Sequence, residues 1–195
     1  MTIRLTTAER KRQIIDEAIK IIHKKGYSAL SIRNLAKSVG ISEPAIYRHF
    51  ASKEDIILGI LDRILEFGNI LKDNLKKVKG TKEKIRRLIF LQIEFLERYP
   101  QMTSIIFSDD IFQPDKRIND KLQAIFDNRH SLLNMIINQA REEGEVIDIE
   151  TEDLGNVIFG YLHLIVFKWR RSNFKFSLME KSEKLIELIY KIIFI

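Results

Sequence analysis

Apolar residues recur at helical spacing along almost the whole chain, and this periodicity restricts the fold more than any other feature of the sequence. The pattern is clear over residues 14–22 and again over residues 118–137. No segment shows the sustained alternation of apolar and polar residues that a half-buried strand requires. The sequence therefore predicts an all-α protein.

Capping residues, prolines and glycines divide this pattern into about nine helices. A capping box at Thr6 and Glu9 opens the first helix, and Pro100 breaks a later one. We expect three short helices, then a long fourth helix, then a helical bundle. The predicted helices cover residues 6–25, 31–39, 42–50, 52–80, 81–99, 101–112, 115–143 and 151–172, with a last one from Ser177 onward.

The excess positive charge lies at the beginning of the chain. The 195 residues include 33 Lys and Arg against 27 Asp and Glu, a net charge of +6. Residues 1–50 contain ten of the basic and four of the acidic residues, so this segment accounts for the whole excess. Such an imbalance indicates an anionic polymer or surface as a partner of this segment, with a solvated basic face as the alternative.

Composition excludes several classes of protein. The chain has no cysteine, which excludes disulfide frameworks, thiolate-bound zinc and thiol catalysis.

The first residues run directly into Glu9-Arg10-Lys11-Arg12 without an apolar segment, so we expect no secretory signal. The longest apolar stretch, 157–167, is too short to span a bilayer. We therefore expect a cytoplasmic protein with no membrane partner.

Residues 31–50 have the pattern of two short helices joined by a tight turn. Gly40 stops the first helix, because glycine adopts the left-handed conformation at low cost. Ser42 caps the second helix, and Pro44 fits its first turn, where a missing N–H costs nothing. Helix, four-residue turn and helix form a helix-turn-helix, whose second helix fits the major groove of DNA.

Core and surface positions of this unit can be separated by their chemistry. The small core that holds the two helices together comprises Leu35, Ala36, Val39, Ile41, Ile46 and Phe50. Lys53 follows at the start of the next helix, a position that favours phosphate. We expect the remaining positions of the second helix to be exposed, namely Glu43, Pro44, Ala45, Tyr47, Arg48 and His49.

These elements resemble the signature of the TetR/AcrR family of bacterial and archaeal transcriptional regulators. The resemblance covers about residues 8–55, and the remaining residues match in architecture alone. It implies a helix-turn-helix DNA-binding domain at 1–52 and a helical ligand-binding and dimerisation domain at 53–195. The matching segments are Gly40-Ile41-Ser42, Ile46-Tyr47-Arg48-His49-Phe50 and Ser52-Lys53-Glu54, preceded by Gly26-Tyr27, Leu30-Ser31-Ile32 and Leu35-Ala36.

The resemblance also implies roles for individual residues. Tyr47, His49 and Lys53 would contact DNA phosphates, although Tyr47 and His49 could instead pack on the small core. Arg33 would reach a guanine, and the first turn of the third helix would face bases or thymine methyls. Arg48 is either a further contact or a solvated charge. The predicted DNA-binding residues are Arg33, Ser42, Glu43, Pro44, Ala45, Tyr47, Arg48, His49 and Lys53.

The second domain is rich in Phe and Ile, which is typical of a helical core but can also leave an apolar cavity. By the resemblance it binds a small effector, and this composition favours an apolar one; we expect no other cofactor. The predicted pocket residues are Phe67, Phe90, Phe107, Phe126, Phe159 and His163. Two alternatives stay open: that His130 and His163 bind a metal, and that Arg86, Arg87, Arg129 or Arg141 meets an acidic head group.

The last two helices have more apolar residues than one buried face needs, which indicates a homodimer. Gly155 and Gly160 would permit close helix approach. A twofold dimer would also let one basic domain per chain read two half-sites of an operator. The predicted interface residues are Leu154, Ile158, Leu162, Ile165, Trp169, Leu185 and Ile189.

Two functions follow from these features. The favoured one is a dimeric repressor that binds a palindromic operator and is released by an apolar small molecule. The alternative is a DNA-bound structural or cell-division protein of the same fold without effector control. The sequence contains no Gly-rich phosphate loop, nucleophile elbow or HExxH motif, so we do not expect an enzyme.

Overall fold

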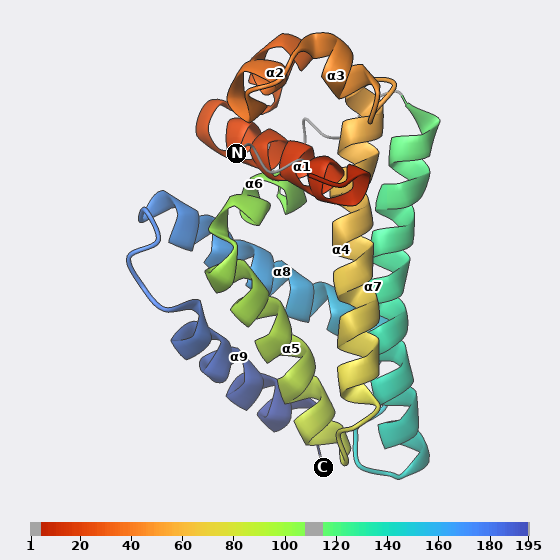
Figure 1. The fold of residues 1–195 in the computed structure, drawn as a ribbon. Coiled ribbons are helices and arrows are strands. Elements are labelled where there is room, and N and C mark those ends of the chain that lie inside the picture. The colour runs from red at the N-terminus through yellow and green to blue at the C-terminus, as the bar shows by residue number, and fades with distance from the viewer. Residues whose placement is uncertain (1–4, 108–114, 195) are drawn as a thin grey trace. The chain divides into compact units, whose positions relative to one another are not determined.

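The computed structural model of the chain describes residues 5–107 and 115–194. Over these residues it contains nine α-helices, two 3-10 helices and no strand apart from one isolated bridge (Figure 1). The all-α fold predicted from periodicity is confirmed. The helices are α1 (Thr7–Lys25), η1 (Tyr27–Ala29), α2 (Ile32–Val39), α3 (Glu43–Tyr47), α4 (Lys53–Leu75), α5 (Thr81–Arg98), η2 (Pro100–Met102), α6 (Thr103–Ile106), α7 (Lys116–Glu142), α8 (Thr151–Arg171) and α9 (Leu178–Ile193).

Three predicted helices are shorter in the structure. The long helix α4 ends at Leu75 rather than near Gly80, because the N–H groups of residues 77 and 78 bond three residues back and Gly80 has a positive φ of 77°. The helix predicted over 101–112 is reduced to η2 and α6, and its last part, including Phe112, lies outside the described residues. Helix α3 ends at Tyr47 instead of Phe50.

The chain forms two compact units, and each is described by itself. The first unit comprises residues 1–64 and 100–123, and the second comprises 65–99 and 124–195. Helices α4 and α7 each continue from one unit into the other. The functional division at residue 52 stays a prediction. None of the described helices combines the length and the apolar character that crossing a membrane requires.

In the first unit, α1 presents its apolar side to α2 and α6. Gly59 of α4 lies so close to α1 that a Cβ there would be 3.0 Å from Ile15 Cδ1. Arg63 of α4 forms an ion pair with Asp16 of α1, and His23 near the end of α1 is hydrogen-bonded to Ser104 at 2.9 Å. The first two contacts hold α1 on the beginning of α4, and the third holds it on α6. They thus fix α1, which with α2 and α3 forms the three-helix head, within the first unit.

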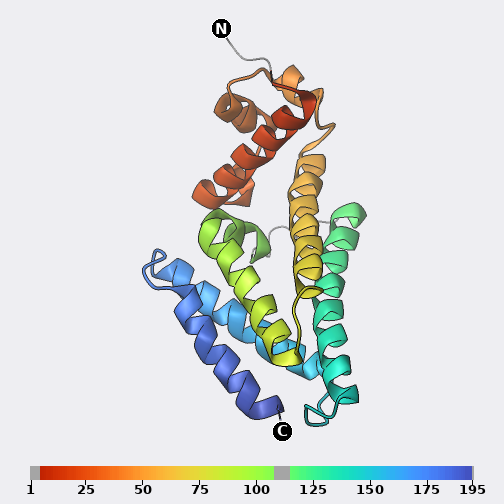
Figure 2. The same ribbon diagram turned by 60° about the horizontal axis from the view of Figure 1, so that its bottom comes forward.

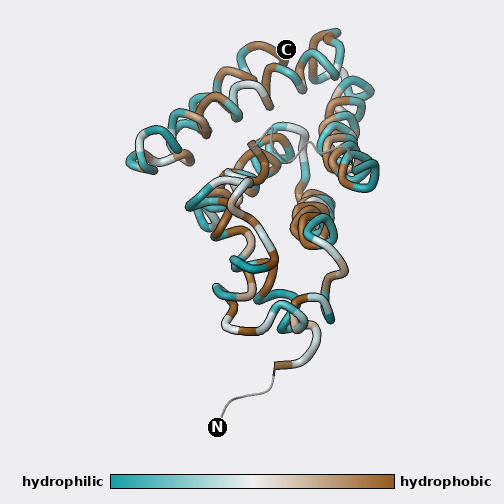
Figure 3. Tube along the Cα trace, turned by 90° about the horizontal axis from the view of Figure 1, so that it is seen from above, coloured by the Kyte–Doolittle hydropathy of each residue, from teal (hydrophilic) through white to brown (hydrophobic). Residues whose placement is uncertain are grey.

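In the second unit, α9 runs beside both α5 and α8 (Figure 2). Ser177 caps α9 through its hydroxyl, which accepts the N–H of Glu180 at 3.2 Å, and a carboxylate from another helix also binds this helix start. Glu97 of α5 accepts the backbone N–H of Leu178 at 2.7 Å and that of Met179 at 3.3 Å. Hydrophobic and hydrophilic segments alternate along the helices in Figure 3, as expected of helices with one side in a core.

Candidate nucleic-acid interface

The turn between α2 and α3 is built as the sequence predicts. Gly40 has a left-handed φ of 76°, and its N–H donates to the Ala36 carbonyl at 2.9 Å. The N–H of Ile41 donates to the same carbonyl at 3.1 Å, and Ser42 Oγ accepts the N–H of Ala45 at 3.3 Å. All of these bonds are local, so they fix the direction in which α3 leaves α2.

Beneath the turn, the small core is largely the predicted one. Leu35 and Ile46 are fully buried, Phe50 is nearly so, and Ile41 is half-buried. Ala45 is a correction: it was expected on the exposed face of α3, but it is 8% exposed. The five-residue helix lies against α2, so its inner side contributes Ala45 together with Ile46 to the core. The Ala45 methyl is therefore not free to meet a thymine.

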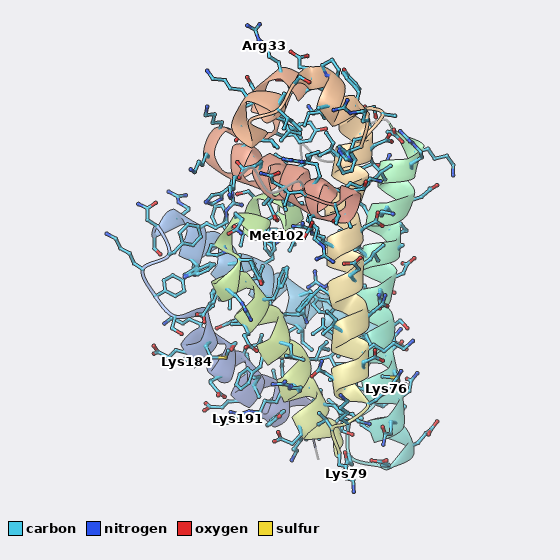
Figure 4. All side chains as sticks on the ribbon, in the orientation of Figure 1. Arg33, Lys76, Lys79, Met102, Lys184 and Lys191 are labelled. Carbon is cyan, nitrogen blue, oxygen red and sulfur yellow. The ribbon has the colours of Figure 1, made fainter. Side chains whose placement is uncertain are left out.

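The outer side of the helix-turn-helix is polar and open to solvent. Arg33 projects from α2 away from the neighbouring helices (Figure 4). Tyr47 is 53% exposed, so its ring and hydroxyl are available to a partner outside the chain. Tyr47 therefore does not pack within the small core. The other predicted contact residues that are exposed are Ser42, Glu43, Pro44 and Arg48.

His49 lies among cations that come partly from a different helix. Its ring is half-buried, and Nδ1 has no hydrogen-bond partner in the described part of the chain. Burial lowers the pKa of His49, and the charges of Lys11, Arg10 and Arg48 lower it further. Lys11 Nζ also lies 5.5 Å from the centroid of the Phe50 ring. The first turns of α1 thus present two cations beside the end of α3.

Sequence reasoning missed Arg10 and Lys11 as members of this site. The basic run at the start of α1 was a signal for them, but nothing in its position indicated that it would lie beside residues 49 and 50. That proximity depends on how α1 packs in the head.

Lys53 is held at the start of α4 by an aromatic ring. Its Nζ lies 4.0 Å from the centroid of the Tyr27 ring, a cation–π contact that orients the ammonium group. Partial burial lowers the pKa of Lys53, while the nearby Glu54 opposes that effect. Tyr27 is part of the family resemblance, but the sequence did not indicate this contact. Only the fold brings the turn after α1 against the beginning of α4.

The predicted pocket residues are divided between the two units. Phe107 belongs to the first unit, whereas Phe67 stacks on Phe95 in the second unit with ring centroids 4.2 Å apart. Phe126 is 41% exposed, and His163 is also on the surface. The remaining two residues, Phe90 and Phe159, each lie beside an arginine.

Two alternatives were left open for the second domain: a metal bound by His130 and His163, and an arginine that meets an acidic head group. Within the described residues, no group of three or more metal-binding side chains comes together. Among the arginines, Arg86 forms an ion pair with Glu183, and Arg87 and Arg141 are exposed. Arg129 is the arginine of this set that the fold buries without a carboxylate in the described part of the chain.

The predicted dimer residues require a correction. All seven are buried inside the second unit, because they form the sides of α8 and α9 that face their own bundle. Buried in this way are Leu154, Ile158, Leu162, Ile165, Trp169, Leu185 and Ile189. The same helices have a separate set of exposed apolar residues, between 44% and 56% accessible. These are Val157, Leu164 and Phe167 on α8 and Leu188 and Ile192 on α9.

These features define a helix-turn-helix DNA-binding protein. The turn between α2 and α3 is rigid, α3 has a polar outer side, and cations lie at both of its flanks. Comparison with known families agrees. Residues 14–60 match the bacterial regulatory proteins of the tetR family, and residues 56–192 match the C-terminal region of YsiA-like proteins. The chain belongs to the TetR family and is a transcriptional regulator.

Individual relatives cover nearly the whole chain. The nucleoid occlusion factor SlmA of Vibrio campbellii is 29% identical over 86% of this chain and 87% of its own length. The fatty acid degradation regulator FadR of Bacillus halodurans has a TM-score of 0.82 at 22% identity, covering 92% and 93% of the two chains. FadR of Bacillus subtilis, solved in complex with stearoyl-CoA, has a TM-score of 0.80 at 24% identity, covering 91% and 96%.

Proposed function

We propose that the protein is a homodimeric repressor that binds a palindromic operator and is released by an apolar small molecule. The observation that carries the proposal is the polar outer side of the helix-turn-helix, with Arg33 and Tyr47 exposed and Lys53 at its flank. In this proposal residues 1–52 bind the DNA, and residues 53–195 bind the effector and the second subunit.

On DNA, α3 enters the major groove, and the side chains around it divide into two groups. The first group faces base edges, where an arginine can pair with guanine through two hydrogen bonds. The second group contacts phosphates and sets the position of the protein on the duplex, whereas base contacts select the sequence. Arg33, Glu43 and Pro44 form the first group; Tyr47, His49, Lys53, Arg10 and Lys11 form the second, and Ser42 and Arg48 complete the interface.

The exposed apolar residues of α8 and α9 support a homodimer. Three of them lie on one side of α8, at positions 157, 164 and 167, and two lie one turn apart on α9. Apolar surface of this kind on a terminal pair of helices is typical of a subunit interface. Two such pairs related by a twofold axis form a four-helix interface.

The apolar effector is supported by the aromatic content of the second unit and by a relative. The described contacts there include the stacked rings of Phe67 and Phe95 and the ring of Phe159, which meets side chains of α7. FadR of Bacillus subtilis was solved with stearoyl-CoA, a molecule with a long apolar chain. We therefore assign the effector to this unit.

A second candidate function is a DNA-bound cell-division protein without effector control. The observation that favours it is the 29% identity to a nucleoid occlusion factor over 86% of the chain. Mapping the bound sites in cells separates the two candidates. A repressor occupies a few promoters, and transcription of the neighbouring genes rises when the protein is deleted. A cell-division protein occupies many sites across the chromosome, without such a change.

The proposal is tested by selecting binding sites from random duplexes with the purified protein. We expect an inverted repeat to be enriched, and the affinity for it to fall steeply with salt because cations contact phosphates. Enrichment of no sequence, or of a site without symmetry, would contradict the proposed operator binding.

Lys53→Ala is expected to weaken binding to the selected duplex and to an unrelated duplex by the same factor. The ammonium group contacts phosphate, which carries no sequence information. The slope of log affinity against log salt should fall by about one unit. Fluorescence anisotropy across a salt series measures both quantities. Lys72→Ala on the same helix is the control, and an unchanged slope for Lys53→Ala would remove this residue from the interface.

DNA affinity is expected to rise as the pH falls, through His49. In the free protein its pKa lies below the usual value because of burial and the cations beside it. A phosphate at this cluster offsets the cations and favours the protonated ring, so the pKa is higher in the complex and binding takes up a proton. Between pH 7.5 and pH 6 we expect an increase of about 3- to 10-fold. His49→Gln should remove it; an equal increase in this variant would assign the effect to other groups.

A further inference from the structure

A polar layer interrupts the apolar inner side of α7 in the second unit. Residues 128–130 are Asn, Arg and His, and each is half-buried. The next turns of the same helix present apolar residues that are almost completely buried. They contain Leu132, Leu133, Ile136, Ile137 and Ala140.

Arg129 is the central residue of this layer, and among the described residues it has no anionic partner. Its guanidinium carbon lies 4.3 Å from the centroid of the Phe159 ring on α8. Its Nε–H is buried and donates to no group in the described part of the chain. Burial alone lowers the pKa of Arg129, to about 10, so the side chain is still charged at neutral pH. Two other half-buried arginines differ: Arg63 and Arg86 each form an ion pair with a carboxylate.

Neighbouring helices leave space for this layer at two glycines. A Cβ at Gly155 of α8 would lie 3.2 Å from His130 Nδ1, and a Cβ at Gly68 of α4 would lie 2.9 Å from Asn128 Nδ2. His130 also meets the Phe159 ring edge-on, with centroids 5.4 Å apart. Asn128 thus faces α4, whereas Arg129 and His130 face α8.

A charge that is largely withdrawn from water without an anion to balance it is costly, and in proteins such groups are normally paired or bind a ligand. We propose that Arg129 anchors the anionic head group of the ligand that the second unit binds, with His130 and Asn128 as further donors. The ligand class is an amphiphile with an apolar chain and a carboxylate or phosphate. This inference rests on the proposed effector-binding function and adds the charge of the effector and the residue that recognises it.

The binding test uses the full-length protein and three probes with the same apolar chain: dodecanoate, dodecanoyl-CoA and uncharged dodecanol. By calorimetry, we expect at least one anionic probe to bind and dodecanol to bind at least about 10-fold more weakly. Arg129→Met should reduce the affinity for the anionic probe by about 10- to 100-fold and leave that for dodecanol unchanged. Arg87→Met, a change at an exposed arginine on α5, is the control and should bind as the wild type does. Dodecanoate binding identifies a carboxylate head, and binding of dodecanoyl-CoA alone identifies the phosphate-bearing CoA head group.

A measurement without ligand tests the same proposal independently of the probes. If Arg129 is held in place for an anion, Arg129→Met removes an uncompensated charge, and the Tm of the free protein should rise by about 2–8 °C. A purely structural arginine predicts a lower Tm, because the contact with Phe159 is lost. A lower Tm, or a wild type that binds dodecanol as tightly as the better of the two anionic probes, overturns the proposal.

DNA binding separates this inference from the proposed function. Without the probe, the Arg129→Met protein should bind the selected operator as the wild type does. The anionic probe should no longer release the variant from the operator. A wild type that binds the probe but no operator would refute the repressor and leave the anchor intact. A wild type that binds the operator but no anionic probe would refute the anchor alone.

Discussion

Arg10→Glu/Lys11→Glu is expected to bind the selected duplex about 100-fold more weakly than the wild type, or more weakly still. The charges of both side chains act on His49 at the end of α3, and Lys11 lies over the neighbouring Phe50 ring, where the proposed interface meets the phosphates. Reversing them removes two favourable contacts and adds two repulsive charges. Anisotropy at two salt concentrations measures the loss, which should be largest at low salt because the effect is electrostatic.

The matched control is Lys24→Glu/Lys25→Glu at the other end of α1. It makes the same change in net charge on the same helix, and both lysines are exposed. Acidic residues are favourable in the first turns of a helix and unfavourable in the last, so folding of α1 is disturbed more by the control than by the test variant. Equal weakening in the two variants would mean that general charge, and not the position beside α3, determines the affinity.

Leu164→Glu is expected to convert the dimer into monomers and to weaken operator binding strongly. Leu164 is 47% exposed in the single chain, so the substitution should leave the fold intact. In a dimer formed through the exposed residues of α8 and α9, a buried carboxylate without a partner should raise the dimer dissociation constant by at least about 100-fold. Sedimentation at several concentrations measures this constant.

Ile70→Glu provides the control, because Ile70 is 56% exposed on α4 and lies outside the proposed interface. Trp169→Asp, by contrast, would not give folded monomers. Trp169 is 4% exposed and meets the Phe174 ring edge-on, so an aspartate there should unfold the bundle. A Leu164→Glu protein that still sediments as a dimer would place the subunit interface elsewhere.

The helix-turn-helix could be predicted from the turn and capping preferences of individual residues. Gly40 and Ser42 act through bonds to residues within five positions of themselves, so their roles are readable from the sequence. Ala45 was misassigned because a helix of five residues has too little periodicity to separate its inner side from its outer side. That separation depends on how α3 lies against α2, which is a tertiary contact.

The subunit interface illustrates a different difficulty. Helix α8 has apolar residues on two sides, and the sequence alone does not say which side meets its own bundle. The buried stripe includes Leu154, Ile158 and Leu162, whereas Val157 and Leu164 point outward. An outward stripe of this kind is recognised only once the packing of the helix is known.

Contacts between segments that are far apart in the chain also could not be predicted from the sequence. Nothing in the spacing of Arg10 and His49, or of Tyr27 and Lys53, indicates that each pair lies together, because only the folded head brings α1 and its following turn to these positions. In the sequence, Arg129 was one of four arginines that could meet an acidic head group. Its burial without an anion among the described residues is a property of the assembled second unit.

The central claim is that α3 and its flanking cations form the DNA contact, and amide hydrogen exchange tests it most directly. Exchange is measured for the full-length protein with and without the selected duplex. We predict that the duplex slows exchange in residues 31–53 and in the first turns of α1, while the exposed sides of α8 and α9 are unchanged. Protection confined to α8 and α9, with residues 31–53 exchanging as in the free protein, would contradict the claim.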